Sequence, residues 1–447
     1  MRPIYVVGHR NPDTDSIASA IGYAWKLGPE VEGEVLAART GPVNDQTAWV
    51  LERLGIEAPV KLTDAAPQFG WTAKRLDAVT PERPLREAWD VLHKTHTVCP
   101  VVDPEGKPLG LITPLSVFEL LCSFIPDGAD PGTASLADLM ARPAIDAADR
   151  GVPSFAGRTS IRDGIQRVLR DEHDDFLVVD DEGRYLGISR KPDLMSPERL
   201  RLVLVDHNGA GQSVGSLDEA DIIEVVDHHR LENLPTRLPI RFTVEPVGST
   251  STIVWNQISR TRRELPASLA GLLLAGIYSD TLMLTSPTTT QGDRDAVDAL
   301  CGLAFAPGSR LEGEKPEDFG KALLRAGAGL DARPPEELVR GDLKVYEAGK
   351  FKFGASQVEV ADEPDLSAHL DRLRKALADL CVEKEFDFAV LMITEVVVSA
   401  SKIVVHHPPP VLEELPYLRL ADGTLDAPGV VSRKKQLLPT ILALLER

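Results

Sequence analysis

Cysteine is scarce in this sequence, and the few cysteines are far apart. The chain has 447 residues and four cysteines, none of which forms a Cys-x-x-Cys pair: Cys99, Cys122, Cys301 and Cys381. Disulfide frameworks and thiolate metal sites use paired or closely spaced cysteines. The spacing therefore argues against both and favours free thiols in a reducing compartment.

Basic residues and long apolar runs are also in short supply. Lys plus Arg number 49 against 68 Asp plus Glu, a formal net charge of −19. This excess of acid argues against a general binder of nucleic acid or anionic membranes, and an anionic substrate would need local cations. No apolar run reaches the roughly 18 residues of a membrane span, and the opening run, Pro3–Val7, is too short for a secretory signal. We therefore expect a cytoplasmic protein of two to four domains.

Three short apolar runs each end in polar residues, as buried parallel strands do. They are followed by Gly8-His9, by Asp206 and by Asp227. The helical spacing of apolar residues over Ile17–Leu27, with Asp15 or Ser16 as the expected N-cap, completes a strand–loop–helix unit. Because the carboxyl ends of parallel strands share one edge of a sheet, these polar residues should converge there.

An internal repeat interrupts this α/β pattern. Val101–Gly110 matches Val178–Gly187 at seven of ten positions, with an offset of 77 residues. Each copy follows an amphipathic helical stretch, and proline- and glycine-rich segments flank the pair. The sequence therefore predicts a paired module that is inserted into the α/β domain.

Histidine and aspartate are concentrated in four motifs at the ends of predicted elements: Gly8–Ser16, Asp206–Asn208, Asp227–His229 and Ser279–Thr281. Each motif alone is usually a solvated turn. If all four had only a structural role, however, many charged side chains would be buried or left without a function. Imidazole and carboxylate without thiolate suit Mn²⁺, Co²⁺ or Zn²⁺, and the abundance of carboxylates favours Mn²⁺. More carboxylates than one ion needs predict two ions, which can activate a water for attack on phosphorus.

A basic cluster, Ser432–Gln436, stands out in this acidic chain. Such a run is usually solvated, yet an anionic phosphate substrate needs cations beyond the metals. The planar guanidinium of Arg433 and the ammonium group of Lys434 could neutralise a phosphate, and Lys344 could add a third cation. We expect the last domain to close over substrate from across the metal site.

Together these motifs resemble the family II, manganese-dependent inorganic pyrophosphatases of the DHH phosphoesterase superfamily, in the subgroup with an inserted pair of CBS domains. The resemblance implies an α/β fold with a doubly wound, parallel-sheet DHH domain, an inserted tandem CBS pair and a C-terminal α/β domain of DHHA2 type. It implies these boundaries: DHH domain 1–66 and 198–328, CBS pair 67–197, DHHA2-type domain 335–447.

The same resemblance implies the site. One ion would be held by His9, Asp13, Asp206 and Asp280, and the other by Asp15, Asp206, His228 and Asp280, so that Asp206 and Asp280 bridge. A bridging hydroxide would then attack pyrophosphate, and His229 would give a proton to the leaving phosphate. Pyrophosphate, arriving with Mg²⁺, would be bound by His229, Lys344, Arg433 and Lys434. The family also implies a homodimer.

The CBS resemblance implies regulation by an adenine nucleotide, AMP, ADP or ATP. The first copy keeps the family's threonine, Thr113, but has Ser116 where an aspartate often stands. The second copy keeps that aspartate, Asp193, but has Arg190 at the threonine position. Both half-sites are therefore altered, and a purely structural module is the alternative.

Two other functions are compatible with parts of the sequence. A DHH-family short-chain exopolyphosphatase or phosphodiesterase would share the metal face, but the basic cluster favours pyrophosphate. A non-catalytic nucleotide sensor would keep the CBS pair alone, but the full set of metal-ligand residues argues against it.

Overall fold

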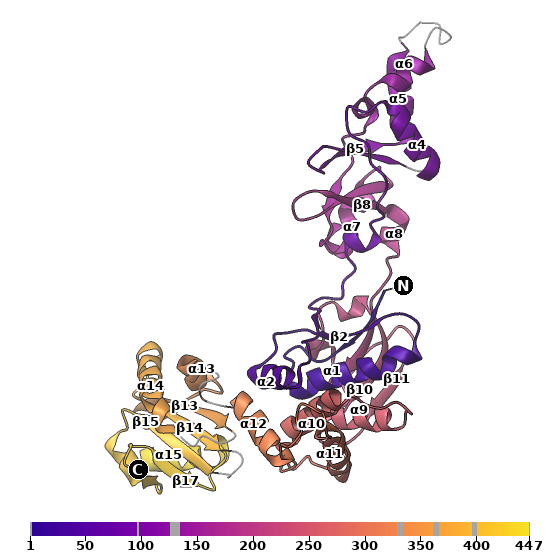
Figure 1. Cartoon of the computed structure of the whole chain (residues 1–447). Coiled ribbons are helices and arrows are strands. Elements are labelled where there is room, and N and C mark those ends of the chain that lie inside the picture. The colour runs from indigo at the N-terminus through magenta and orange to yellow at the C-terminus, as the bar shows by residue number, and fades with distance from the viewer. Residues whose placement is uncertain are drawn as a thin grey trace.

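The computed structural model describes residues 2–95, 98–125, 135–328, 330, 334–360, 366–395 and 400–446. Figure 1 shows three parts in space: a parallel-sheet domain, an inserted module that projects from it, and a C-terminal domain connected through helix α12. Across these described residues no helix is both long and apolar enough to span a bilayer. All four cysteines are free thiols, as the sequence predicts.

The first domain is built on a six-stranded parallel sheet in the order β11-β10-β9-β1-β2-β3. Its strands are β1 Ile4–Val7, β2 Val35–Arg39, β3 Val60–Lys61, β9 Arg201–Val205, β10 Asp221–Asp227 and β11 Arg241–Val244. From β1 the chain moves outward through β2 and β3, and after the module it returns on the other side of β1. The neighbours β1 and β9 thus form a topological switch point, where ligands usually bind in such sheets.

The two faces of this sheet are buried by alternating residues of each strand. In β9, Val203 and Val205 join the core beneath the helices, while Leu202 and Leu204 pack against the opposite face. The helices of this domain are α1 Thr14–Leu27, α2 Asp45–Leu54, α9 Thr250–Ser259, α10 Ala267–Thr281, α11 Gln291–Ala304 and α12 Pro316–Ala328. The predicted α/β class is confirmed.

Helix α1 begins two or three residues earlier than the sequence pattern suggests. Its N-cap is Asp13, whose side chain accepts a hydrogen bond from the Ser16 backbone N–H at 2.9 Å. The expected N-caps, Asp15 and Ser16, are wrong, because both lie within the first turn and are fully buried. Burial of a carboxylate in a first helical turn is costly unless it is bonded or paired, so Asp15 needs a partner.

The inserted module consists of two similar units, which confirms the internal repeat. Strand β4 Cys99–Val102 pairs with β5 Pro108–Ile112, and β7 Asp175–Val179 pairs with β8 Tyr185–Arg190. Both hairpins are antiparallel, and both shift register at the matching positions Val101/Val102 and Val178/Val179. The other elements are α3 Phe69–Thr72, α4 Leu85–Thr95, α5 Pro114–Phe124, α6 Leu136–Ala141, β6 Ser154–Ala156, α7 Ile161–Arg170 and α8 Lys191–Met195.

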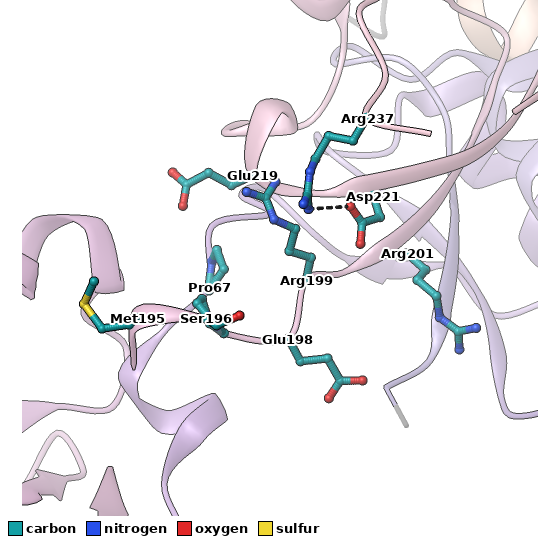
Figure 2. A pocket seen from close by; sticks show the side chains of 10 residues that line it. Pro67, Met195, Ser196, Glu198, Arg199, Arg201, Glu219, Asp221 and Arg237 are labelled. Carbon is teal, nitrogen blue, oxygen red and sulfur yellow. Dashed lines mark hydrogen bonds and ion pairs between the residues drawn. The ribbon is translucent and has the colours of Figure 1, made fainter. Parts of the chain in front are cut away.

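Two linkers join the module to the parallel-sheet domain. A cavity of about 700 Å³ lies beside them, and Figure 2 shows arginine and carboxylate side chains around it, with Arg237 paired to Asp221 at 3.3 Å. An ion pair also crosses the junction, since Arg162 of α7 lies 2.7 Å from Glu219 of the parallel-sheet domain. The module is therefore attached through polar contacts as well as through the chain.

The C-terminal domain has a mixed sheet in the order β12-β13-β14-β15-β17-β16. Its strands are β12 Lys344–Ala348, β13 Phe351–Val360, β14 Phe388–Glu395, β15 Ala400–His406, β16 Leu418–Arg419 and β17 Leu425–Pro428. Helices α13 Pro335–Arg340 and α14 Leu370–Lys384 contribute to one apolar core, and α15 Leu438–Leu445 contributes to a second one. This second α/β unit agrees with the predicted architecture.

Candidate metal centre

The predicted metal-ligand residues converge at the carboxyl ends of the central strands. His9 follows β1, Asp206 follows β9 and His228 follows β10, while Asp13 and Asp15 lie at the start of α1 and Asp280 near the end of α10. Their ligand atoms form overlapping groups in which all atoms lie within 4.8 Å of one another: His9, Asp13, Asp206; Asp15, Asp206, His228, Asp280; and Asp206, His228, His229. Asp206 belongs to every group.

The first group is centred on the His9 ring. Its Nε2 atom lies 3.3 Å from Oδ2 of Asp13 and 3.3 Å from Oδ2 of Asp206. Burial opposes protonation of His9, but contact with these two carboxylates outweighs it and raises the pKa of His9 to about 10. A proton therefore occupies this position in the absence of another cation.

The second group is more deeply buried. Nε2 of His228 lies 3.5 Å from Oδ1 of Asp206 and 3.6 Å from Oδ2 of Asp280. Asp15 and Asp206 are almost fully buried, and helix α10 approaches Asp15 closely at Gly276. A Cβ atom at Gly276 would lie 2.9 Å from Oδ1 of Asp15, so glycine is required for this approach.

The crowded carboxylates of this cluster, and its buried atoms that make no hydrogen bond, suit a site that binds cations. Burial and the neighbouring Asp15 carboxylate raise the pKa of Asp206 to about 7, and burial with the same neighbour raises the pKa of Asp280 well above its usual value. Among the described residues, Asp206 Oδ2 and His228 Nε2 are buried atoms that make no hydrogen bond. Unpaired buried acceptors are costly, and cations at this position would satisfy them.

A hydroxyl-rich segment that the sequence reasoning missed, residues 247–252, holds the second group in place. Asp15 accepts hydrogen bonds from the Ser249 hydroxyl at 2.7 Å and from the backbone N–H groups of Thr250 and Ser251 at 2.6 and 2.9 Å. The Thr250 hydroxyl donates to Oδ1 of Asp206 at 3.0 Å. The segment thus supplies the partners that the buried Asp15 needs. Four consecutive hydroxyl residues, Ser249 to Thr252, at the start of helix α9 were the available signal.

The orientation of His228 is also set by this segment. Its Nδ1–H donates to the Val247 carbonyl oxygen at 3.1 Å. In the neutral ring Nε2 therefore carries the lone pair, which faces the carboxylates. Such a second hydrogen bond commonly fixes a metal-binding histidine.

The neighbouring His229 is oriented by a different carboxylate. Its Nδ1 lies 2.9 Å from Oδ1 of Asp227, a hydrogen bond that raises the pKa of His229. Asp227 in turn accepts from the Asn208 amide at 2.5 Å. The ring is about half exposed, which leaves Nε2 as its nitrogen available to a ligand.

The predicted substrate cations lie in the C-terminal domain. Lys344 and Lys434 are exposed, whereas Arg433 is only 5% exposed and pairs with the Asp342 carboxylate at 3.1 Å. Asp342 is two residues before Lys344, so the structure brings these basic residues near one another. No hydrogen bond or ion pair among the described residues joins them to the metal-ligand cluster.

Three of the four predicted nucleotide residues, Thr113, Ser116 and Arg190, line adjacent pockets of the module. Thr113 and Ser116 form a reciprocal capping box at the start of α5 and line a cavity of about 610 Å³ with Asp149, Glu172 and Asp174. Arg190 lies 3.5 Å from Asp175 in a neighbouring cavity of about 450 Å³. Asp193 instead pairs with Lys74 at 3.0 Å. The pocket at the first copy is strongly acidic.

Comparisons with known proteins agree with this architecture. Two family models match: "DHH family, N-terminal domain" over residues 3–277, and "DHHA2 domain" over residues 321–444. The chain is 37% identical over 249 residues to a Lactobacillus acidophilus protein named as a manganese-dependent inorganic pyrophosphatase, covering 55% of this chain and 78% of the relative. It is 26% identical to the cobalt-dependent inorganic pyrophosphatase of Clostridium perfringens, covering 98% of this chain and 97% of that relative.

Among solved structures, the CBS-pair protein CBSX2 from Arabidopsis thaliana covers 29% of this chain and 92% of its own, with 16% identity and a TM-score of 0.24. The match of the DHH model to more than half of the chain, together with the identity to the pyrophosphatase from Lactobacillus, establishes the family. The chain belongs to the DHH family, among the manganese-dependent, family II inorganic pyrophosphatases.

Proposed function

We propose that this chain hydrolyses inorganic pyrophosphate to two phosphates with two divalent metal ions, Mn²⁺ or Co²⁺, per chain. The observation that carries the proposal is the convergence of six imidazole and carboxylate side chains around Asp206, with two buried ligand atoms, Asp206 Oδ2 and His228 Nε2, that make no hydrogen bond. Relatives named for manganese and cobalt support the choice of ion.

The first ion would be held by His9, Asp13, Asp206 and Asp280, and the second by Asp15, Asp206, His228 and Asp280. Two ions at such a site supply, when bound, the positive charge that activates water and neutralises phosphate oxygens. Asp206 is fully buried between both groups, which suits a residue shared by two cations.

His229 would serve as the proton donor to the leaving phosphate. Its Nδ1–H is committed to Asp227, so Nε2 is the atom that would face substrate. The same hydrogen bond favours the protonated ring, the form that a general acid needs.

Lys344, Arg433 and Lys434 would bind the phosphate groups after the C-terminal domain closes over the metal centre. The exposure of both lysines, and the contact that places Arg433 beside the Lys344 strand, support a shared anion-binding surface. Mg²⁺ would arrive with pyrophosphate and carry part of its charge.

We further propose that the module binds an adenine nucleotide, with the phosphates nearer Arg190 than Thr113. The cavity at Arg190 also contains Lys191, so two cations face its two carboxylates, Asp174 and Asp175. The cavity at Thr113 has five carboxylates and one histidine, and this excess of negative charge repels phosphate. The nucleotide would alter catalysis by binding one conformation of the enzyme better than another. A cytoplasmic homodimer completes the proposal, and the molecular mass in solution tests the dimer.

The decisive experiment is phosphate release by chelator-treated protein that is reloaded with Mn²⁺ or Co²⁺ in Mg²⁺ buffer. Pyrophosphate, tripolyphosphate and a short oligonucleotide are supplied in parallel. Preferential release from pyrophosphate supports the proposal. Preferential turnover of either other substrate identifies the exopolyphosphatase or phosphodiesterase, and no turnover with any of them leaves the nucleotide sensor.

A further inference from the structure

The carboxylate of Asp293 is fully buried in the parallel-sheet domain, in the first turn of α11, and lies outside all of the metal-ligand groups. It accepts hydrogen bonds from the Gly248 backbone N–H at 2.9 Å and from the Thr252 hydroxyl at 2.6 Å. It also accepts from the backbone N–H and the hydroxyl of Thr290, both at 2.7 Å. Hydrogen bonds to a carboxylate are stronger than those between neutral groups, so Asp293 holds the backbone and side chains of its donors in place.

Two of those donors stand at the two ends of the segment that supports the metal centre. Between Gly248 and Thr252 lie the three residues that donate to Asp15 and Asp206, and Val247, just before Gly248, orients His228. Asp293 therefore holds the segment through bonds to Gly248 and Thr252, which flank the three residues that bond to the metal ligands.

The close fit at Gly248 shows how little this segment can move. A Cβ atom there would lie 2.7 Å from the Thr281 side chain and 3.0 Å from Oδ2 of Asp293. Thr281 is the residue after Asp280, so the segment is confined between Asp293 and the end of α10. Displacement of the segment would disturb Asp15, Asp206 and His228 together.

The first ligand group has its own support. Asp13 is held as the N-cap of α1, and the His9 backbone N–H donates to the Ser16 hydroxyl at 3.1 Å. Neither His9 nor Asp13 bonds to the 247–252 segment in the described structure. The segment supports the second group through Asp15, Asp206 and His228, whereas it supports the first group only through the shared Asp206.

We propose that Asp293 is a positioning residue that selectively sets the affinity of the second metal site, the one formed by Asp15, Asp206, His228 and Asp280. It acts through the 247–252 segment and touches neither metal nor substrate. This inference rests on the proposed two-metal function.

The test measures Mn²⁺ bound per chain by equilibrium dialysis and elemental analysis, using the full chain. In Asp293→Ala the ion at the second site should bind about 10- to 100-fold more weakly, the usual effect of removing an outer-shell partner, and the ion at the first site should lose clearly less affinity. Asp293→Asn should keep most of the wild-type affinity for the second ion, because the asparagine carbonyl can accept from Gly248 while its amide donates to the Thr252 hydroxyl. Asp298→Ala, an exposed position on the same helix, is the matched control.

The inference is overturned if both ions keep their affinity in folded Asp293→Ala, or if both weaken equally. Should Asp293→Ala fail to fold, the same measurement is made on Thr252→Val, which removes one of the two bonds between Asp293 and the segment. A smaller loss of Mn²⁺ affinity at one site supports the inference. Unchanged Mn²⁺ affinity at both sites refutes it. Wild-type protein that binds fewer than two ions instead refutes the two-metal function itself.

Discussion

Nε2 of His228 lies 3.5 Å from Oδ1 of Asp206, yet no hydrogen bond joins them. Because the His228 Nδ1–H is given to Val247, a neutral His228 ring and an ionised Asp206 carboxylate turn lone pairs toward each other at a buried position. That arrangement is unfavourable in the absence of a cation, and the metal centre is therefore the place where function and stability are coupled.

Replacement of Asp206 should abolish catalysis. Asp206→Ala removes a carboxylate that belongs to both ligand groups, so Mn²⁺-dependent phosphate release should fall to background. Asp218→Ala, at an exposed aspartate in the same domain, should retain full activity. Substantial turnover by Asp206→Ala would contradict the two-metal account.

The metal-free protein should lose stability as pH rises. The folded-state pKa of Asp206 is raised to about 7 and that of His9 to about 10, so in each case the folded state holds a proton more tightly than the unfolded chain. Asp206 then destabilises the fold between about pH 4 and 7, and His9 between about pH 6.5 and 10, by up to about 1.4 kcal/mol per pH unit each.

Thermal unfolding of chelator-treated protein checks this expectation. The midpoint should be lower at pH 8 than at pH 5, and addition of Mn²⁺ should raise it more at pH 8, where the ion replaces fewer protons. The variant Asp206→Asn should show a weaker pH dependence below pH 7. A midpoint that rises with pH would contradict the assigned charges.

Substrate binding by the C-terminal domain is best tested at Lys434. This side chain is exposed and makes no bond that supports the fold among the described residues, unlike Arg433, whose guanidinium is buried against Asp342. Lys434→Ala should lower kcat/KM for pyrophosphate by about 10- to 100-fold, the range for loss of a charge-assisted hydrogen bond. Lys435→Ala, the adjacent exposed lysine, is the control. Equal effects of the two variants would indicate a general charge effect.

Nucleotide regulation should depend more on Arg190 than on Ser116. Arg190→Ala removes a cation from the second pocket and should weaken the effect of AMP, ADP or ATP on turnover, with basal phosphate release unchanged. Ser116→Ala alters a residue in the acidic pocket and should change the response little. The measurement is phosphate release across a nucleotide titration, and the reverse order would place the phosphates at the first copy.

Much of the architecture could be predicted because it depends on local patterns. Apolar runs that end in Gly8, Asp206 and Asp227 predict parallel strands with polar carboxyl ends, and the repeated ten residues predict two equivalent hairpins, which share even a bulge. Resemblance to a family was needed to choose among the pooled histidines and aspartates, because a spacing alone does not say which side chains share an ion.

Other features were decided only by the tertiary structure. Asp15 was expected at a helix cap, but the fold buries it and supplies donors from residues more than 230 positions away. Arg433 belongs to a basic run of the kind that is usually exposed. In the structure it is buried, because its guanidinium donates to the Ala355 carbonyl oxygen of β13 and pairs with Asp342. The spacing of Thr290 and Asp293 is that of a helix capping box, but nothing in the sequence shows that Asp293 also bonds to Gly248 and Thr252.

By itself, therefore, the sequence determined the residue types of the metal centre, their order along the chain and the strand ends that carry them. The periodicity of a strand or helix and the chemistry of a motif are local properties. The supporting bonds behind those ligands, and the acidic lining of the Thr113 pocket, join segments that are distant in the chain. Only the packing of the sheet, the helices and the module brings such segments into contact, so only the tertiary structure could decide them.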